Sequence, residues 1–308
     1  MSRRFICLLA LTLVSTLVLT GCNPAALRAI PIVLLALDEL GEDPFLQSAA
    51  GGIAGVVAGG GGTVSGDDAG LYGGSPRGKH CDKGKLVRFL RANPAKGKAW
   101  AKAVGIATAE IGEHVSGLTP VVLRRDTLVR NHGYRNGKAT MVHAVLEAGT
   151  AVLVDRFGTP AVKCDCGNPL LTPEEDIDVD GSKYRGKKWK GFSKKKVTVV
   201  EKGDEQQAVR LTELNATTGE ETGGVVDRPV GTEGQQDVVV EPPATPCPTP
   251  TEGTPPSDTS CPTPTDTPTT DPTPTEDLTP TEDPTPTDDP TPTEEPPTVD
   301  PTQPPPSA

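Results

Sequence analysis

The fold is decided by residues 118–129, which read Leu-Thr-Pro-Val-Val-Leu-Arg-Arg-Asp-Thr-Leu-Val. Two short runs in this stretch, Pro120–Leu123 and Thr127–Val129, are rich in β-branched and other apolar residues and have the length of strands. The patterns before this stretch are helical, and those after it are typical of strands. We therefore predict an α+β fold: a small domain with a helical N-terminal half and a short antiparallel β-sheet, followed by a disordered tail.

Three helices are predicted before residue 118. The first contains Leu86–Leu90 and should end at Asn93-Pro94, because a proline disfavours helical backbone in the residue before it. The second covers about 95–104 and carries Trp100 on its apolar face, and the third covers about 109–115. An aromatic residue among small helices favours a packing role for Trp100 over a ligand platform.

Strands and connections make up the rest of the predicted domain, which covers residues 30–201. Residues 151–155 and 160–164 predict a hairpin with a glycine in its turn, and residues 197–200 predict a last strand. The apolar run 29–37 does not distinguish a buried strand from a helix. The Gly-rich stretch 51–74 predicts a loop, and residues 202–241 predict a linker.

The C-terminal residues 242–308 differ in composition from the rest of the chain. They contain thirteen Asp and Glu residues and no Lys or Arg, so the net charge of −11 is a property of this segment. Its Pro, Thr and acidic residues show no hydrophobic periodicity and cannot bury enough apolar surface to offset the entropy of ordering. We predict an extended, disordered tail.

The N-terminus has the organisation of an export signal. The basic Met1–Arg4 is followed by the apolar run Phe5–Leu19, which is shorter than the roughly 20 residues that a membrane-spanning helix needs. The next residues, Thr20-Gly21-Cys22, complete a sequence that resembles a bacterial lipobox. We predict a signal peptide at 1–21, lipidation of Cys22, a lipid-anchored N-terminus at 22–29, and location on the extracytoplasmic face of the cell membrane.

Five cysteines remain once those of the export signal and the anchor are set aside: Cys81, Cys164, Cys166, Cys247 and Cys261. Export favours disulfides. Cys164 and Cys166 share one face if they lie in a strand, so either could bond to Cys81, and the two tail cysteines could close a loop or join two chains. The alternative is a zinc site that includes His80, but the Cys-x-Cys spacing is tighter than structural zinc sites favour. We predict a disulfide and no metal.

A basic and aromatic segment follows the predicted hairpin. Tyr184, Trp189 and Phe192 are interleaved with eight basic residues: Lys183, Arg185, Lys187, Lys188, Lys190, Lys194, Lys195 and Lys196. Outside the cell the available anions are lipid headgroups, wall polymers and the acidic tail, so we expect no nucleic acid as a partner. Two interpretations stay open: a solvated strand pair whose Trp189 and Phe192 point into the core, or a face that binds anions.

Signals for catalysis and for cofactors are weak. His132 and His143, with Asp126 and Asp155, are the obvious acid–base candidates, and no common nucleophile motif accompanies them. Residues 176–181 resemble the start of a calcium-binding loop, but Lys187 stands where the twelfth residue should be Glu. We predict no cofactor.

Several blocks of the chain are similar, in order, to the domain of unknown function numbered 6777, which occurs in actinobacterial envelope proteins. The blocks are Asp43–Phe45, Gly70–Gly74, Leu118–Thr127, Asn131–Tyr134, Gly149–Asp155, Cys164–Leu170, Tyr184–Gly186, Trp189–Phe192 and Val197–Val200. The resemblance implies an envelope setting and a domain at roughly 30–201. It implies no catalytic residue, because the family has no assigned activity.

Three functional hypotheses follow. The first is a non-enzymatic surface lipoprotein that is attached to the membrane by its lipid and binds an anionic envelope polymer or an envelope protein. The alternative is a cell-wall-modifying hydrolase of unrecognised type that uses His132 or His143. The third is autoinhibition, in which the acidic tail covers the basic segment, and it predicts strong salt dependence.

Overall fold

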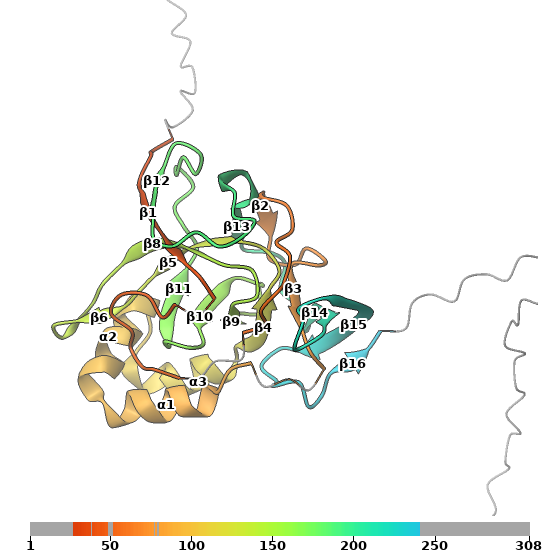
Figure 1. The fold of residues 1–308 in the computed structure, drawn as a ribbon. Coiled ribbons are helices and arrows are strands. Elements are labelled where there is room, and N and C mark those ends of the chain that lie inside the picture. The colour runs from red at the N-terminus through yellow and green to blue at the C-terminus, as the bar shows by residue number, and fades with distance from the viewer. Residues whose placement is uncertain (1–26, 38, 49–51, 77, 79, 241–308) are drawn as a thin grey trace, which may run out of the picture. The chain divides into compact units, whose positions relative to one another are not determined.

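The computed structural model describes residues 27–240, apart from 38, 49–51, 77 and 79 (Figure 1). The chain divides into two units, Met1–Thr245 and Pro246–Ala308, and all described residues belong to the first. The predicted signal peptide, Cys22, the two tail cysteines and the tail itself lie outside the described residues.

Fourteen strands within the described residues form one mixed sheet, and two more form a separate hairpin. In chain order the strands are β1 (Pro31–Leu35), β2 (Gly62–Ser65), β3 (Tyr72–Gly74), β4 (Thr119–Leu123), β5 (Thr127–Asn131), β6 (Tyr134–Arg135), β7 (Lys138–Ala139), β8 (Val142–Leu146), β9 (Ala151–Val154), β10 (Pro160–Lys163), β11 (Asn168–Leu171), β12 (Lys183–Arg185), β13 (Thr198–Glu201), β14 (Ala208–Leu214), β15 (Glu221–Pro229) and β16 (Val238–Val239). The sheet order is β12-β1-β8-β5-β11-β10-β9-β4-β3-β14-β15-β16, with β13 beside both β5 and β2. The hairpin is β6–β7.

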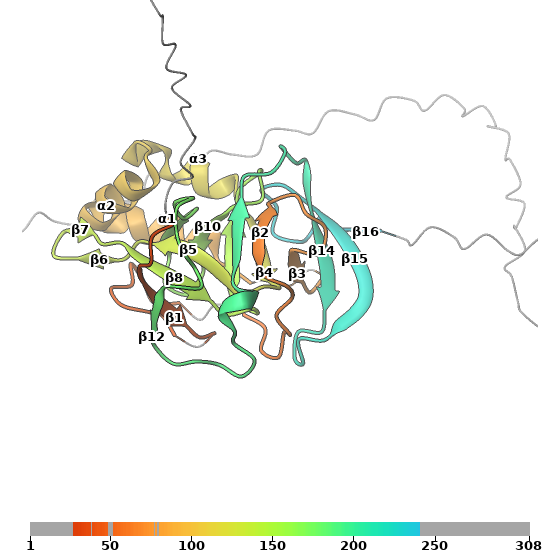
Figure 2. The same cartoon turned by 90° about the horizontal axis from the view of Figure 1, so that it is seen from above.

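The helices are α1 (Lys83–Ala92), α2 (Pro94–Val104) and α3 (Ile111–Ser116), with short 3-10 turns η1 (Thr108–Glu110) and η2 (Lys194–Lys196). The three α-helices gather on one side of the sheet (Figures 1 and 2). Their apolar faces form one core with Leu153 of β9 and Val162 of β10. Trp100 is at its centre and donates its indole N–H to the carbonyl of Gly167 at 2.9 Å, which confirms the packing role.

The predicted fold class, a small α+β domain with a helical N-terminal half and a short antiparallel sheet, is wrong. In the part of the chain that the structure describes, the α-helices are confined to Lys83–Ser116, and three strands precede them. The sheet is large and mixed, because β1 pairs in parallel with β8 and β12, β13 with β2 and β5, and β14 with β3. Parallel partners such as Ile32 and His143 are far apart in the chain, so no local pattern shows their pairing.

The Gly-rich stretch predicted as a loop contributes β2 and β3. Gly73 lies in buried β3 between β4 and β14, where an added Cβ would stand 2.6 Å from Cδ1 of Leu214. Gly61, just before β2, approaches the backbone of Lys195 and Lys196 too closely for a side chain. These glycines permit close backbone approach within a sheet, which composition alone does not separate from a flexible loop.

Residues 202–241, predicted as a linker, instead carry β14, β15 and β16. Val209, Leu211 and Leu214 of β14 are buried, as is Val226 of β15. The alternation Val209-Arg210-Leu211-Thr212 is the period of a half-buried strand, so the signal was present in the sequence.

Several local predictions are confirmed. Helix α1 ends at the cap Asn93 before Pro94, and α2 ends at Gly105, whose φ of 85° is left-handed. The predicted hairpin is β9–β10, antiparallel, with Gly158 at a φ of 73° in its turn. The run 29–37 contains a strand, β1.

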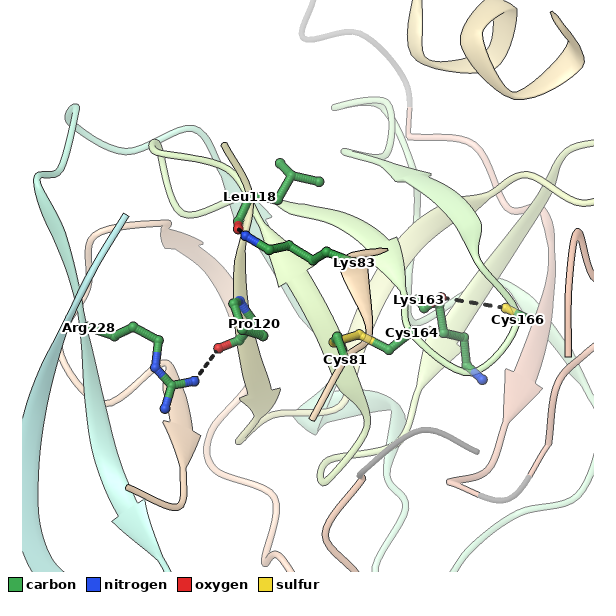
Figure 3. Close-up of a disulfide and its surroundings, with 8 residues drawn as sticks. All are labelled: Cys81, Lys83, Leu118, Pro120, Lys163, Cys164, Cys166 and Arg228. Carbon is green, nitrogen blue, oxygen red and sulfur yellow. Dashed lines mark hydrogen bonds between the residues drawn. A yellow bond between two sulfur atoms is a disulfide. The ribbon is translucent and has the colours of Figure 1, made fainter. Parts of the chain in front are cut away.

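A disulfide joins the helices to the sheet (Figure 3). Cys81 precedes α1 and Cys164 follows β10, and their Cα atoms are 5.3 Å apart. Cys166 is a buried free thiol, and burial raises its pKa. The predicted disulfide is therefore confirmed, and Cys164 rather than Cys166 is the partner of Cys81.

Candidate ligand-binding site

The basic segment, residues 183–196, begins with β12 at one edge of the sheet and ends with η2, just before β13. Its aromatic residues Tyr184, Trp189 and Phe192 are half-buried against a core that includes Leu34 and Val145. The rings contact one another, with centroids 5.0 Å apart for Trp189 and Phe192 and 5.6 Å for Tyr184 and Phe192. The aromatics therefore fix the segment to the domain while its basic side chains point outward.

Most of the basic side chains are free. Arg185 forms an ion pair with Glu42 at 3.1 Å, and Lys194 donates to the carbonyls of Asp180 and Ser182. The remaining side chains are exposed and have no hydrogen bond or ion pair within the described part of the chain: Lys183, Lys187, Lys188, Lys190, Lys195 and Lys196. Most of the positive charge of the segment is thus uncompensated by the domain.

A pocket of about 510 Å³ opens beside this segment, and we call it the Trp189 pocket. It is lined by Trp189, Lys190 and Lys196, by residues 56–58 of the Gly-rich stretch, and by Glu147 and Ala148 of the turn after β8. Its volume lies within the range of roughly 300–1,000 Å³ that is typical of small-molecule sites. Three segments that are remote in sequence therefore build one hollow.

Asp126 lines the same pocket and anchors two of its walls. Its side chain is fully buried, and it accepts hydrogen bonds from the backbone N–H of Ala148 at 3.0 Å and from the indole N–H of Trp189 at 3.2 Å. Burial raises the pKa of Asp126, against the opposing effect of these hydrogen bonds and of Lys196. The sequence predicted Asp126 only as an acid–base candidate. In the structure, its carboxylate instead fixes the orientation of the Trp189 indole.

One wall of the pocket could not be predicted. Val57 is 84% exposed, an unusual position for a large apolar side chain, and it stands beside Trp189 in the pocket lining. The only sequence signal at this position is a valine pair within a glycine-rich stretch, which carries no information about a site.

The acid–base candidates are dispersed. His143 Nε2 lies 2.7 Å from Oε2 of Glu174. Burial alone would raise the pKa of Glu174, but the hydrogen bonds from His143 and from its own backbone N–H, together with the charges of His143 and Arg130, lower it. His132 lines a different pocket, and burial lowers its pKa. The carboxylate of Asp155 accepts bonds from Phe157 and Thr159 within its own turn. The structure brings neither histidine to the Trp189 pocket.

The segments considered for metals have other contacts. Asp176 binds Arg28 in a bidentate ion pair, and Asp178 accepts a bond from the N–H of Gly181 at 2.8 Å. Cys81 and Cys164 are joined to each other. The described residues contain no group of three or more His, Cys, Asp or Glu side chains placed to hold a metal ion.

Between residues 27 and 240, as far as the structure describes them, no helix combines the length and hydrophobicity that crossing a bilayer requires.

The described residues thus form a mixed-sheet domain with a pocket beside a basic, aromatic segment. The family described as Domain of unknown function (DUF6777) matches residues 62–231, and the chain belongs to this family. The match includes β14 and β15 as well as the basic segment. No curated protein and no solved structure matches the chain.

Proposed function

We propose that this protein is a non-enzymatic lipoprotein of the actinobacterial cell envelope that binds an anionic polymer through the basic segment and the Trp189 pocket. The anchor rests on the lipobox-like residues that end at Cys22, which lie outside the described part of the structure. Two acyl chains or more on such a cysteine hold a protein durably at a membrane.

The observation that carries the proposal is a set of exposed, unpaired lysines beside a tryptophan-lined pocket. Lys190 and Lys196 flank Trp189 in the pocket lining, and Asp126 holds the indole in place. Lysines without partners are strongly hydrated point charges that attract phosphate or carboxylate groups, whereas an aromatic face offers apolar contact to a sugar ring. A sugar polymer with anionic substituents combines the two.

The ligand class also follows from geometry. The free lysines extend along the whole segment from Lys183 to Lys196, beyond the pocket itself. A long polyanion can contact many of them at once, and the pocket can accept one unit of the chain. Most of the affinity should therefore be electrostatic and should fall as salt rises.

The test is a titration of the full chain with poly(glycerol phosphate) and polygalacturonate, with neutral dextran as the control polymer. We expect both polyanions to bind and dextran not to bind, with binding lost as salt rises from about 0.05 to 0.5 M. Trp189→Leu should weaken the salt-resistant part of the binding. No binding of either polyanion at low salt would contradict the proposal.

The hydrolase alternative makes a separate prediction. A double variant, His132→Ala with His143→Ala, should retain polyanion binding, because neither histidine lines the Trp189 pocket. If the full chain breaks down wall polymer and the double variant does not, the hydrolase alternative is favoured instead.

A further inference from the structure

We propose that a second pocket, between α2 and the β6–β7 hairpin, binds an anionic amphiphile: a small molecule with an apolar body and one carboxylate or phosphate group. This pocket, which we call the α2 pocket, has a volume of about 580 Å³ and shares no lining residue with the Trp189 pocket. Its volume also falls in the range of roughly 300–1,000 Å³ of small-molecule sites. It is therefore a separate site with its own chemistry.

The body of the pocket is apolar and is formed by small residues. Ala95, Ala99 and Ala103 repeat every four residues and so lie along one face of α2. Gly137 and Ala139 of the hairpin line the other side. Because alanine and glycine cannot fill the space between a helix and a hairpin, an apolar hollow is left between the two elements.

Charged groups at the pocket are all of one sign. Lys98 and Lys102 come from α2 and Lys138 from β7, and no Asp or Glu is among the described residues that line the pocket. None of the three has a hydrogen bond or ion pair among the residues that the structure describes. The nearby Asp43 is occupied, since it accepts from Nε of Arg135 at 2.8 Å. A negative group would therefore meet three uncompensated cations.

The contrast with Lys96 on the same helix supports this reading. Lys96 donates to the carbonyl of Phe45, and its ammonium lies 4.9 Å from the ring centre of Phe89 and 5.4 Å from that of Tyr134. Lys96 thus serves to fix α2 against its neighbours. Lys98 and Lys102 have no such contact and stay available to a ligand.

His132 adds one polar group to the lining. It follows the end of β5, and burial favours its neutral imidazole by lowering its pKa. Hydrogen bonds of the ring with the backbone of Pro169 and of Arg130 oppose this shift without reversing it. An apolar wall, a neutral polar group and three lysines together suit a ligand that is apolar along its body and negative at one end.

The experiment is calorimetric titration of the full chain with dodecanoate and dodecyl phosphate below their micellar concentrations. Dodecyl maltoside and inorganic phosphate separate the contributions of the apolar body and the charge. We expect one or both anionic amphiphiles to bind, and their relative affinities show whether the pocket prefers a carboxylate or a phosphate head group. Dodecyl maltoside and inorganic phosphate should bind at least about tenfold more weakly.

Variants locate the binding. Ala103→Leu, at a half-exposed helical position, should fill the pocket, and Lys98→Glu should reverse one of its charges. Each should weaken binding roughly tenfold, whereas Arg88→Glu, an exposed charge reversal on α1, should leave it unchanged. The proposal is overturned if neither anionic amphiphile binds, if the uncharged one binds equally well, or if both pocket variants bind like the unmodified chain.

Discussion

Cationic side chains occupy two contrasting environments in this domain. Lys83, Lys163 and Arg228 are buried, and all three are paired, whereas most lysines of the basic segment are exposed and unpaired. A buried charge must be compensated because its desolvation costs several kcal/mol. An exposed lysine has no such requirement. The buried cations therefore hold the fold together, and the exposed ones are available for a ligand.

The partners of the buried cations show what they hold together. Lys83 donates to the carbonyls of Ser116, Leu118 and Gly231 at 2.8–3.0 Å, and so ties α1 to the end of α3 and to the segment after β15. Burial lowers the pKa of Lys83. Figure 3 shows its bond to Leu118 beside the disulfide.

Arg228 makes the corresponding contacts on β15. It donates to both carboxylate oxygens of Asp237 at 2.7 and 2.8 Å and to the carbonyl of Pro120 at 2.7 Å, a bond drawn in Figure 3. The buried ion pair thus joins β15 to the segment just before β16, and the hydrogen bond to Pro120 fastens β15 to β4.

The largest expected effect comes from breaking this pair. Arg228→Met leaves Asp237 buried without its partner, so we expect a loss of about 3–5 kcal/mol in the free energy of unfolding. The matched control is Arg210→Met, which removes a bidentate pair with Asp227 from the exposed side of the same hairpin and should cost at most about 1 kcal/mol. Urea unfolding measures both. If both variants lost the same free energy of unfolding, the claim that buried cations stabilise the fold more than exposed ones would be contradicted.

The disulfide gives the second largest effect. Replacing Cys81 and Cys164 by Ser frees two points that are 83 residues apart, and we expect a loss of about 2–4 kcal/mol. Cys166→Ser is the control, because Cys166 has no disulfide partner in the structure. If Cys166→Ser were as costly as the double replacement, the pairing described here would be incorrect.

Asp126 extends the comparison of buried and exposed charged groups, because it is a buried carboxyl group next to the exposed lysines of the basic segment. Burial raises its pKa above the ordinary 3.8, so the native state binds its proton more tightly than the unfolded chain does. The stability that Asp126 contributes is therefore fully present below about pH 4 and is lost as pH rises through its native-state pKa. The difference in unfolding free energy between the unmodified chain and Asp126→Asn should fall over this range. If the difference in unfolding free energy stayed constant or rose with pH, the raised pKa of Asp126 would be contradicted.

Parts of the fold were accessible from sequence for a physical reason. The ends of α1 and α2 depend on Pro94 and Gly105, and the β9–β10 turn depends on Gly158, which are local effects. The parallel pairing of β1 with β8 and of β13 with β2 depends on contacts between distant segments. Strand β14 is an intermediate case, because its alternation is local but its acidic surroundings resemble a linker.

The residues of the candidate site also divide into those that local sequence predicts and those that only the folded chain brings together. Composition singled out Trp189 and the lysines of the basic segment, since they adjoin one another in sequence. The part of the lining that contains Val57, and the hydrogen bond by which Asp126 holds the indole, form only when distant segments come together in the folded chain. The α2 pocket likewise needs the hairpin to lie against α2.

The smallest expected effect on stability belongs to the variant that tests polyanion binding by the basic segment most directly. Lys190→Glu with Lys196→Glu should lower the free energy of unfolding by no more than about 1 kcal/mol, because both side chains are exposed and neither forms a hydrogen bond or ion pair, and the charge of Lys196 acts on Asp126 only from the surface. The matched control is Lys85→Glu with Arg88→Glu, the same change of charge at exposed positions on α1.

The deciding measurement is the affinity of these two variants and of the unmodified full chain for poly(glycerol phosphate) at low salt. We expect a loss of roughly tenfold or more in affinity for the Lys190/Lys196 variant and little change for the α1 variant. Equal weakening in both would mean that net charge, and not the basic segment, determines binding, and would contradict the central claim.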